Sequence, residues 1–142
     1  MRLSTKGRYA VMAMADLARR EGEAARGVAL ADIAARQEIS LSYLEQLFAR
    51  LRRQGLVRSA RGPGGGYRLA KVAEAMSVAE IVHAVDEPLR ATRCSGRGHG
   101  CMQKGERCLT HDLWEDLGCR IEDYLASVSL ADVIGGKLRR AA

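Results

Sequence analysis

The stretch VALADIAARQEISLSYLEQLFARLRRQGLV, residues 28–57, most constrains the fold of this chain because it carries two helical patterns in succession. Its apolar residues recur every three or four positions, first at Leu30, Ile33 and Ala34 and then at Leu44, Leu47, Phe48 and Leu51. Ser40 lies between them and is a favourable N-cap for the second helix. Two short helices joined by a tight turn predict a helix-turn-helix, with a plain helical hairpin as the alternative.

The residues after this pair predict a β-hairpin. Gly55 ends the second helix, and LVRSA, RGPGGGY and RLAK follow as strand, turn and strand. A hairpin directly after a helix-turn-helix is typical of a wing, which weakens the alternative of an ordinary glycine-rich loop. Glycines at its tip let the backbone approach a phosphate, so we expect DNA contacts from Arg61, Gly64 and Gly65.

The second helix offers polar groups near its start that can reach base edges. We expect this helix to contact DNA through Ser40, Ser42, Tyr43, Glu45 and Gln46. Glu45 differs from the others because phosphates repel a carboxylate and cytosine N4 is its only good base partner. We therefore expect Glu45 to disfavour sites that lack a suitable cytosine.

The charge distribution agrees with a nucleic-acid partner for the first half. Residues 1–71 contain 14 Lys and Arg against 6 Asp and Glu, whereas residues 72–142 contain 9 against 11. A basic half joined to a mildly acidic half indicates a polyanion partner for the first and protein contacts for the second. A solubilising surface is the alternative. Aromatic residues make up only 4% of the chain, which favours a mainly α fold.

The N-terminal stretch MRLSTKGRYAVMAMADLARR is almost continuously apolar from Arg8 to Asp16, which predicts a mostly buried helix. It is too short to span a membrane and lacks a signal-peptide cleavage site. We therefore expect a cytoplasmic protein without a membrane partner. In that compartment thiols stay reduced, so clustered cysteines more often bind metal or sense redox state than form structural disulfides.

Two further helices are predicted in the second half. MSVAEIVHAVDEP forms a short helix in which Ser77 is a possible cap and His83 a structural residue. HDLWEDLGCRIEDYLASV forms a longer one with a stripe of Leu113, Leu117, Ile121, Tyr124 and Val128. We expect this stripe to pack on its counterpart in a homodimer, with folding back onto its own chain as the alternative.

The stretch CSGRGHGCMQKGERCLTH, residues 94–111, concentrates potential metal ligands. Cys94, Cys101 and Cys108 are separated by six residues each, and His111 follows Cys108 after two. Three thiolates and one imidazole suit zinc or a [2Fe–2S] cluster. Zinc sites usually draw ligands as two close pairs, whereas long glycine-rich spacers can wrap a larger inorganic core. The spacing favours an iron–sulfur cluster over zinc, and leaves both zinc and a thiol or disulfide switch open.

Other uses of these residues are less favoured. His99 is a spare candidate ligand, and Cys119 lies off the apolar stripe as a free surface or interface thiol. An enzyme with a Cys108–His111 pair lacks a third orienting residue and an oxyanion motif, and it would leave the basic half unexplained.

At this level the chain resembles the IscR family of bacterial iron–sulfur cluster regulators, which are winged-helix transcription factors. The resemblance runs through MRLSTKGRYAV, ISLSYLEQLF, RGPGGGY, AVDEPLRATRC and RCLTHDLW, and so covers nearly the whole chain. His111 distinguishes the chain from the related nitric-oxide-sensing regulators, which do not place a histidine after the third cysteine.

The resemblance implies that Cys94, Cys101, Cys108 and His111 hold a [2Fe–2S] cluster. It implies a dimer that binds a palindromic double-stranded DNA operator, receives its cluster from the assembly machinery, and represses or activates cluster-assembly genes. The expected division is a winged helix-turn-helix over 1–72 and a cluster-binding loop with a dimerisation helix over 73–142. Both spacers are one residue longer than the five of the family pattern, which bears on cluster type and stability.

Overall fold

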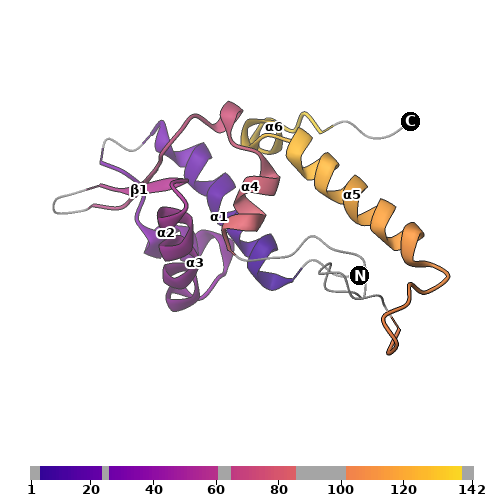
Figure 1. Cartoon of the computed structure of the whole chain (residues 1–142). Helices are drawn as coiled ribbons and strands as arrows, with labels where there is room; N and C mark the ends of the chain where they lie inside the picture. Colours follow the sequence, from indigo (N-terminus) through magenta and orange to yellow (C-terminus); the bar gives the residue numbers. More distant parts are fainter. Residues whose placement is uncertain (1–3, 24–25, 61–64, 86–101, 139–142) are drawn as a thin grey trace.

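The computed structural model describes residues 4–23, 26–60, 65–85 and 102–138. Its elements are α1 (Thr5–Glu21), α2 (Leu30–Gln37), α3 (Leu41–Arg53), β1 (Val57–Ser59), β2 (Tyr67–Leu69), the 3₁₀ turn η1 (Ala73–Ala75), α4 (Val78–Ala84), α5 (His111–Ser127) and α6 (Leu130–Ile134). The predicted mainly α fold with a small β-hairpin is confirmed. Figure 1 shows α1, α2, α3 and the hairpin gathered at one end, α4 in the middle, and α5 extending to the other end.

The core of the winged-helix end is built from the two predicted stripes and from α1. Leu44, Phe48 and Leu51 of α3 are fully buried, as is Ile33 of α2. The Phe48 ring meets the ring of Tyr67 edge to face, with centroids 5.0 Å apart. α1 contributes Ala10, Ala13, Met14 and Leu17 to the same core. The apolar period of each segment therefore decided which face turned inward.

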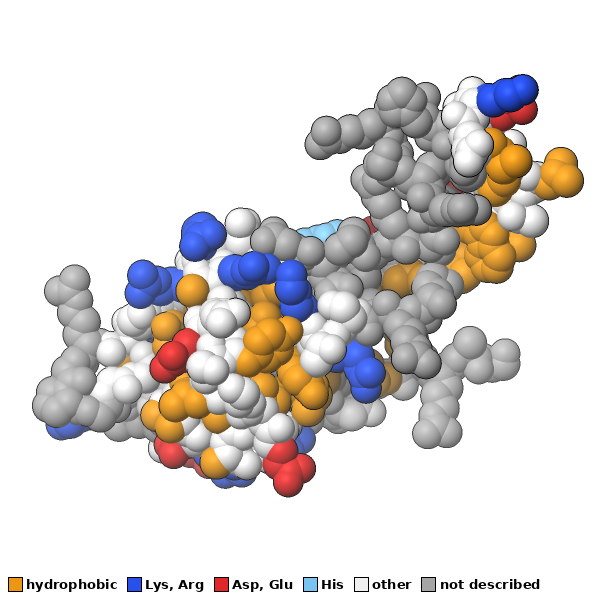
Figure 2. Space-filling model, turned by 90° about the horizontal axis from the view of Figure 1, so that it is seen from below, with side chains coloured by type: hydrophobic (Ala, Val, Ile, Leu, Met, Phe, Trp, Pro, Cys, Tyr) orange, Lys and Arg blue, Asp and Glu red, His pale blue; other side chains and the backbone are white. Residues whose placement is uncertain are grey.

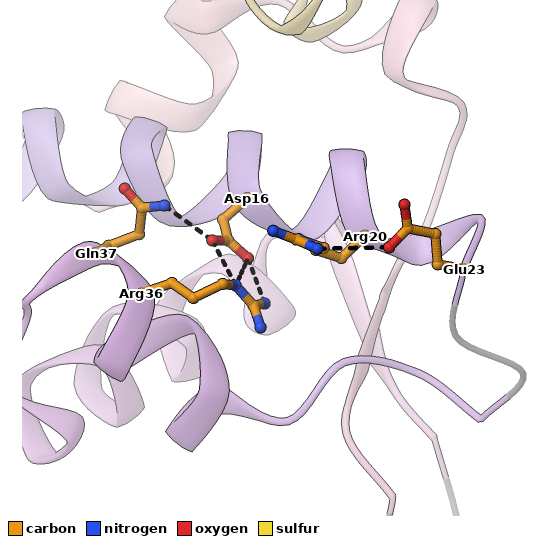
Figure 3. A network of polar contacts seen from close by, with 5 residues as sticks. All are labelled: Asp16, Arg20, Glu23, Arg36 and Gln37. Carbon is orange, nitrogen blue, oxygen red and sulfur yellow. Dashed lines mark hydrogen bonds and ion pairs between the residues drawn. The ribbon is translucent and has the colours of Figure 1, made fainter.

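An ion pair with a buried carboxylate and a partly exposed guanidinium fixes α1 against α2 (Figure 3). Asp16 accepts hydrogen bonds from Arg36 through Nη2 at 2.6 Å and Nε at 3.0 Å, and from Gln37 Nε2 at 2.8 Å. Burial by itself raises the pKa of the Asp16 carboxyl, but the hydrogen bonds from Arg36 and Gln37 outweigh it and hold that pKa below its usual value. Asp16 is thus ionised and hydrogen-bonded, and it is the one charged group among the buried residues of α1.

The turn between α2 and α3 depends on two residues. Glu38 ends α2 in the left-handed region, with φ 54° and ψ 45°. Ser40 then starts α3 as predicted, and its Oγ accepts a hydrogen bond from the Tyr43 N–H at 3.5 Å. Because a residue with a Cβ rarely adopts a positive φ, the turn holds Glu38 in a strained conformation.

The hairpin pairs β1 with β2 in antiparallel register, with Arg58 opposite Arg68. An isolated bridge adds Val28 beside Tyr67, with their N–H and C=O groups bonded at 2.9 and 2.8 Å. Gly66 lies where an added Cβ would overlap the Val28 carbonyl, so this close approach requires glycine. The sequence pattern predicted the hairpin but not the third strand segment.

The helices after the hairpin pack back on the winged-helix core. Met76, Ile81, Val85 and Leu130 belong to the same hydrophobic cluster as α1 and α3. Ser77 caps α4 as expected, in a capping box with Glu80. α6, which the sequence patterns did not predict, places Leu130 in the core. The division at residue 72 stays a prediction, and the described core extends across it.

Within the described part of the chain, neighbouring helices pack on one side of α5. Ile121 and Leu125 pack against Val78 and Val82 of α4, whereas Leu113 and Tyr124 are more than half exposed. Part of the predicted stripe therefore packs back on its own chain, and the rest is exposed to solvent. Thr110 is the N-cap residue of α5 but makes no side-chain cap. Its hydroxyl instead accepts a hydrogen bond from Trp114 Nε1 at 3.1 Å. None of the helices in the described ranges combines the length and hydropathy that a membrane span requires.

Candidate nucleic-acid interface and metal centre

The outer face of α3 presents polar side chains to solvent. Ser42, Glu45 and Gln46 are exposed, while Leu44 and Leu47 of the same helix are buried. Ser40 is exposed at the start of the helix, and its Oγ lies 3.1 Å from Ser42 Oγ. An α-helix with its first turns open on one face has the shape that enters a major groove. The four exposed candidates therefore lie together on one accessible surface.

Tyr43 differs from its neighbours because it is half-buried. Its ring packs edge to face on Tyr9 of α1, with centroids 6.0 Å apart. The ring thereby connects the start of α3 to α1, and its partial exposure still leaves it at the surface. Tyr43 thus has a packing role that the sequence pattern did not indicate.

The hairpin is connected to α3 through Arg52, whose Nη1 donates to Ser59 Oγ at 3.2 Å. Arg58 of β1 is exposed and Gly65 is half-buried, while Arg61 and Gly64 lie outside the described residues. Figure 2 shows Lys and Arg side chains at several places over the winged-helix end. α3 and the hairpin therefore lie among Lys and Arg side chains, whose positive charge attracts phosphates.

Cys108 and His111 lie together where the chain enters α5. The His111 N–H donates to the Cys108 carbonyl at 3.1 Å, which places both residues on one turn. Cys108 is half-buried, with Sγ 3.7 Å from Thr110 Oγ1, and His111 is almost fully buried. Cys94, Cys101 and His99 lie outside the described residues, so two of the four expected ligands are placed.

His111 also has carboxylates beside it. Its Nε2 is 3.6 Å from Glu115 Oε2, one turn further along α5. Ligand atoms of His111, Asp112 and Glu115 lie within 4.8 Å of one another, and both carboxylates are exposed. Asp112 also pairs with Arg107 at 3.3 Å. The carboxylates of Asp112 and Glu115 therefore place negative charge close to His111 at the start of the helix.

The patterns missed several residues that hold this surface in place. Asp16 carried a detectable signal, since a charged residue in a buried helix requires a partner. Its partners Arg36 and Gln37 carried none, because they lie 20 and 21 residues further along the chain. The contact of Arg52 with Ser59 carried none either, because it depends on how β1 folds back against α3. His83, expected to be structural, is exposed and pairs through Nε2 with Glu122 Oε1 at 2.6 Å.

Sequence comparison identifies close relatives along nearly the whole chain. It is 57% identical to the HTH-type transcriptional regulator IscR of Erwinia tasmaniensis and 58% identical to that of Photorhabdus laumondii. Each match covers 96% of this chain and 81% of the relative. The relatives are transcriptional regulators, so the chain is a DNA-binding regulator and not an enzyme.

Solved structures agree with the fold. The structure of T. potens IscR superposes with a TM-score of 0.77 at 37% identity, covering 100% of this chain and 93% of that one. CymR, the global cysteine regulator of B. subtilis, gives 0.78 at 31% identity, with 96% and 98% covered. Residues 3–136 match the Rrf2 family, described as iron-dependent transcriptional regulators. The chain therefore belongs to the Rrf2 family.

Proposed function

We propose that this regulator senses iron–sulfur cluster status through a [2Fe–2S] cluster and controls genes for cluster assembly. The observation that carries the proposal is the placement of Cys108 and His111 on one turn at the start of α5, with His111 buried. Thiolate and imidazole are the donors that such a cluster takes. The iron dependence described for the family supports the same conclusion.

Cys94, Cys101, Cys108 and His111 would hold the cluster. The two described ligands fit it, because a half-buried thiol and a buried imidazole on one turn can be desolvated together. The bound cluster would supply a redox-active and labile iron group whose presence reports cluster supply. Cys108 and His111 lie on the turn at which α5 begins. Binding of a group to this turn would therefore also order the start of the helix.

The DNA contacts are proposed for the outer face of α3 and for the wing. Ser40, Ser42, Tyr43 and Gln46 would read base edges, Glu45 would disfavour some sites, and Arg61, Gly64 and Gly65 would contact phosphates. Support comes from the exposure of the α3 side chains and from the contact between Arg52 and Ser59, which holds the wing strand against the helix.

The functional unit is proposed to be a homodimer on a palindromic operator. α5 leaves Leu113, Trp114 and Tyr124 exposed along one side, and hydrophobic side chains show at that end of the molecule in Figure 2. A second copy offers the same stripe, and two copies related by a two-fold axis would bury both. Two-fold symmetry of the protein would then match two half-sites in DNA.

The proposed setting is the cytoplasm, where the assembly machinery would donate the cluster. The longer spacers bear on cluster type, so the decisive experiment is anaerobic purification followed by absorption spectroscopy and analysis for iron, sulfide and zinc. We expect visible absorbance with iron and sulfide in equal amounts. Zinc in stoichiometric amount, or a colourless protein without metal, would favour the alternatives of structural zinc or a thiol switch.

Single substitutions then identify the ligands. Cys94→Ala, Cys101→Ala or Cys108→Ala should each remove most of the absorbance while the protein stays folded. Cys119→Ala is the matched control, since Cys119 is exposed on α5, and it should keep the absorbance of the wild type. His111→Cys should keep a cluster that survives mildly acid pH better, because protonation displaces imidazole. Full cluster retention in all three cysteine-to-alanine variants would disprove the ligand set.

A further inference from the structure

α4 packs on both ends of the molecule. Ile81 and Val85 belong to the main core with α1 and α3, while Val78 and Val82 form a second cluster with Ile121 and Leu125 of α5. Figure 1 shows α4 between the winged-helix end and α5. A displacement of α5 would therefore reach the winged-helix end through α4.

Polar contacts reinforce both sides of α4. Toward α5, His83 Nε2 lies 2.6 Å from Glu122 Oε1. Toward α3, Arg50 Nη1 donates a hydrogen bond to the carbonyl oxygen of Val85 at 3.1 Å. Val85 is the C-cap residue of α4 and is fully buried, so its carbonyl accepts this bond within the protein.

The chemistry of a helix end explains why an arginine suits this place. The last carbonyls of a helix have no partner within it and carry partial negative charge, which a cation stabilises. A guanidinium also keeps its charge at every physiological pH. Arg50 therefore fixes the end of α4 relative to the last turns of α3.

Arg50 also differs from the other arginines at this end of α3. Arg52 and Arg53 are exposed, whereas Arg50 is half-buried and turned toward α4. A surface arginine near a DNA-reading helix can neutralise a phosphate, but a guanidinium bonded to a carbonyl inside the protein is poorly placed to do so. The position of Arg50 thus indicates a structural link between helices.

We propose that Arg50 is a positioning residue that couples α3 to α5 through the end of α4. A change in the turn that holds Cys108 and His111 would alter α5 and α4, and Arg50 would transmit this change to the DNA-reading helix. The inference rests on the proposed function. Coupling between two binding events is reciprocal in free energy, so DNA binding must change the affinity of the turn that holds Cys108 and His111 by the same factor. We expect this to show as a change in the surroundings of the first turn of α5.

Trp114 reports that reciprocal effect without any bound metal. It is the single tryptophan of the chain, lies in the first turn of α5 and donates to Thr110 Oγ1. The experiment titrates metal-free protein with a DNA duplex that the wild type has selected from a random-sequence pool. We expect the Trp114 emission of the wild type to change on DNA binding. In Arg50→Ala at saturating DNA this change should be about threefold smaller, because the coupling between α3 and α5 is lost.

Two variants give the comparison. Arg53→Ala, in the same turn but exposed, should keep the emission change and reduce the slope of log K against log salt by about one if Arg53 meets a phosphate. Arg50→Ala should leave that slope unchanged. Arg50→Lys keeps a charged donor and should restore part of the emission change. Should Arg50→Ala unfold, Arg50→Gln replaces it, since its amide is too short to reach Val85.

The outcomes separate the two proposals. The coupling role alone is overturned if Arg50→Ala shows the same emission change as the wild type. It is also overturned if the slope of log K against log salt falls by about one in that variant. Absence of any DNA-dependent emission change in the wild type also overturns it. Failure of the wild type to select any DNA overturns the proposed DNA contacts, and with them the coupling that rests on them.

Discussion

The winged-helix end and α5 use the same helical pattern with opposite results. In α3 the apolar stripe is completely buried, with Leu44, Phe48 and Leu51 inaccessible to solvent. In α5 the buried residues are His111 and Gly118, and large apolar side chains such as Leu113 and Tyr124 remain exposed. The comparison teaches that periodicity indicates which face of a helix avoids water but not which surface covers it. The apolar stripe of α3 is covered within the chain, whereas large apolar side chains of α5 remain exposed to solvent.

The largest expected effect tests whether packing within one chain stabilises the winged-helix end. Phe48→Ala removes a fully buried ring that packs on Tyr67, and should lower the free energy of unfolding by about 3–5 kcal/mol. Denaturant titration followed by circular dichroism measures the loss. Leu113→Ala is the matched control at the other end: it should change unfolding of the isolated chain little and weaken self-association instead. Equal losses in the two variants would remove the contrast.

The ion pair of Asp16 should contribute the next largest effect. Asp16→Asn leaves Arg36 without its carboxylate and should cost about 3 kcal/mol, at the lower end for buried pairs because the Arg36 side chain is 32% exposed. The folded-state pKa of Asp16 lies below its value in the unfolded chain. The stabilisation is therefore fully present above the unfolded-state pKa and is lost as the pH falls through the folded-state pKa.

Unfolding measured from pH 7 downward checks this sign. The difference between wild type and Asp16→Asn should be constant near neutrality and shrink only in strong acid. A difference that already disappears at pH 6 would show that another group is responsible.

Glu45 tests whether the exposed face of α3 acts on DNA without help from α5. Glu45→Ala should leave affinity for well-matched sites nearly unchanged and raise affinity for sites lacking a suitable cytosine by about 1–3 kcal/mol per half-site. The gain should appear in metal-free protein as well, because the penalty of the carboxylate is local. Competition binding at one salt concentration measures it. A uniform loss of affinity would instead make Glu45 a favourable contact.

The smallest effect concerns the turn between α2 and α3. Glu38 has a φ of 54°, so Glu38→Gly should relieve strain and stabilise the protein by about 1 kcal/mol. Glu38→Ala keeps a Cβ and should give no such gain. Thermal unfolding of the three proteins shows whether the backbone conformation or the carboxylate matters.

Several features followed from the sequence alone because they depend on neighbouring residues. The helical periods predicted α2, α3 and α5, Ser40 and Ser77 marked helix starts, and the glycine-rich stretch after Gly55 predicted a hairpin. The outer face of α3 and its exposed polar residues followed from the same period. These patterns also carried the resemblance that the comparisons confirmed.

Other features were decided only in three dimensions. α6 is five residues long and is held by Leu130 in a core made elsewhere in the chain, so its local pattern is weak. The partners of Asp16 lie 20 and 21 residues away, and Arg50 meets Val85 over a separation of 35. Local sequence determines which face of a helix is apolar and where the helix begins. Which distant group meets a given charge or carbonyl depends on how the helices pack, since only packing brings such groups within hydrogen-bond distance.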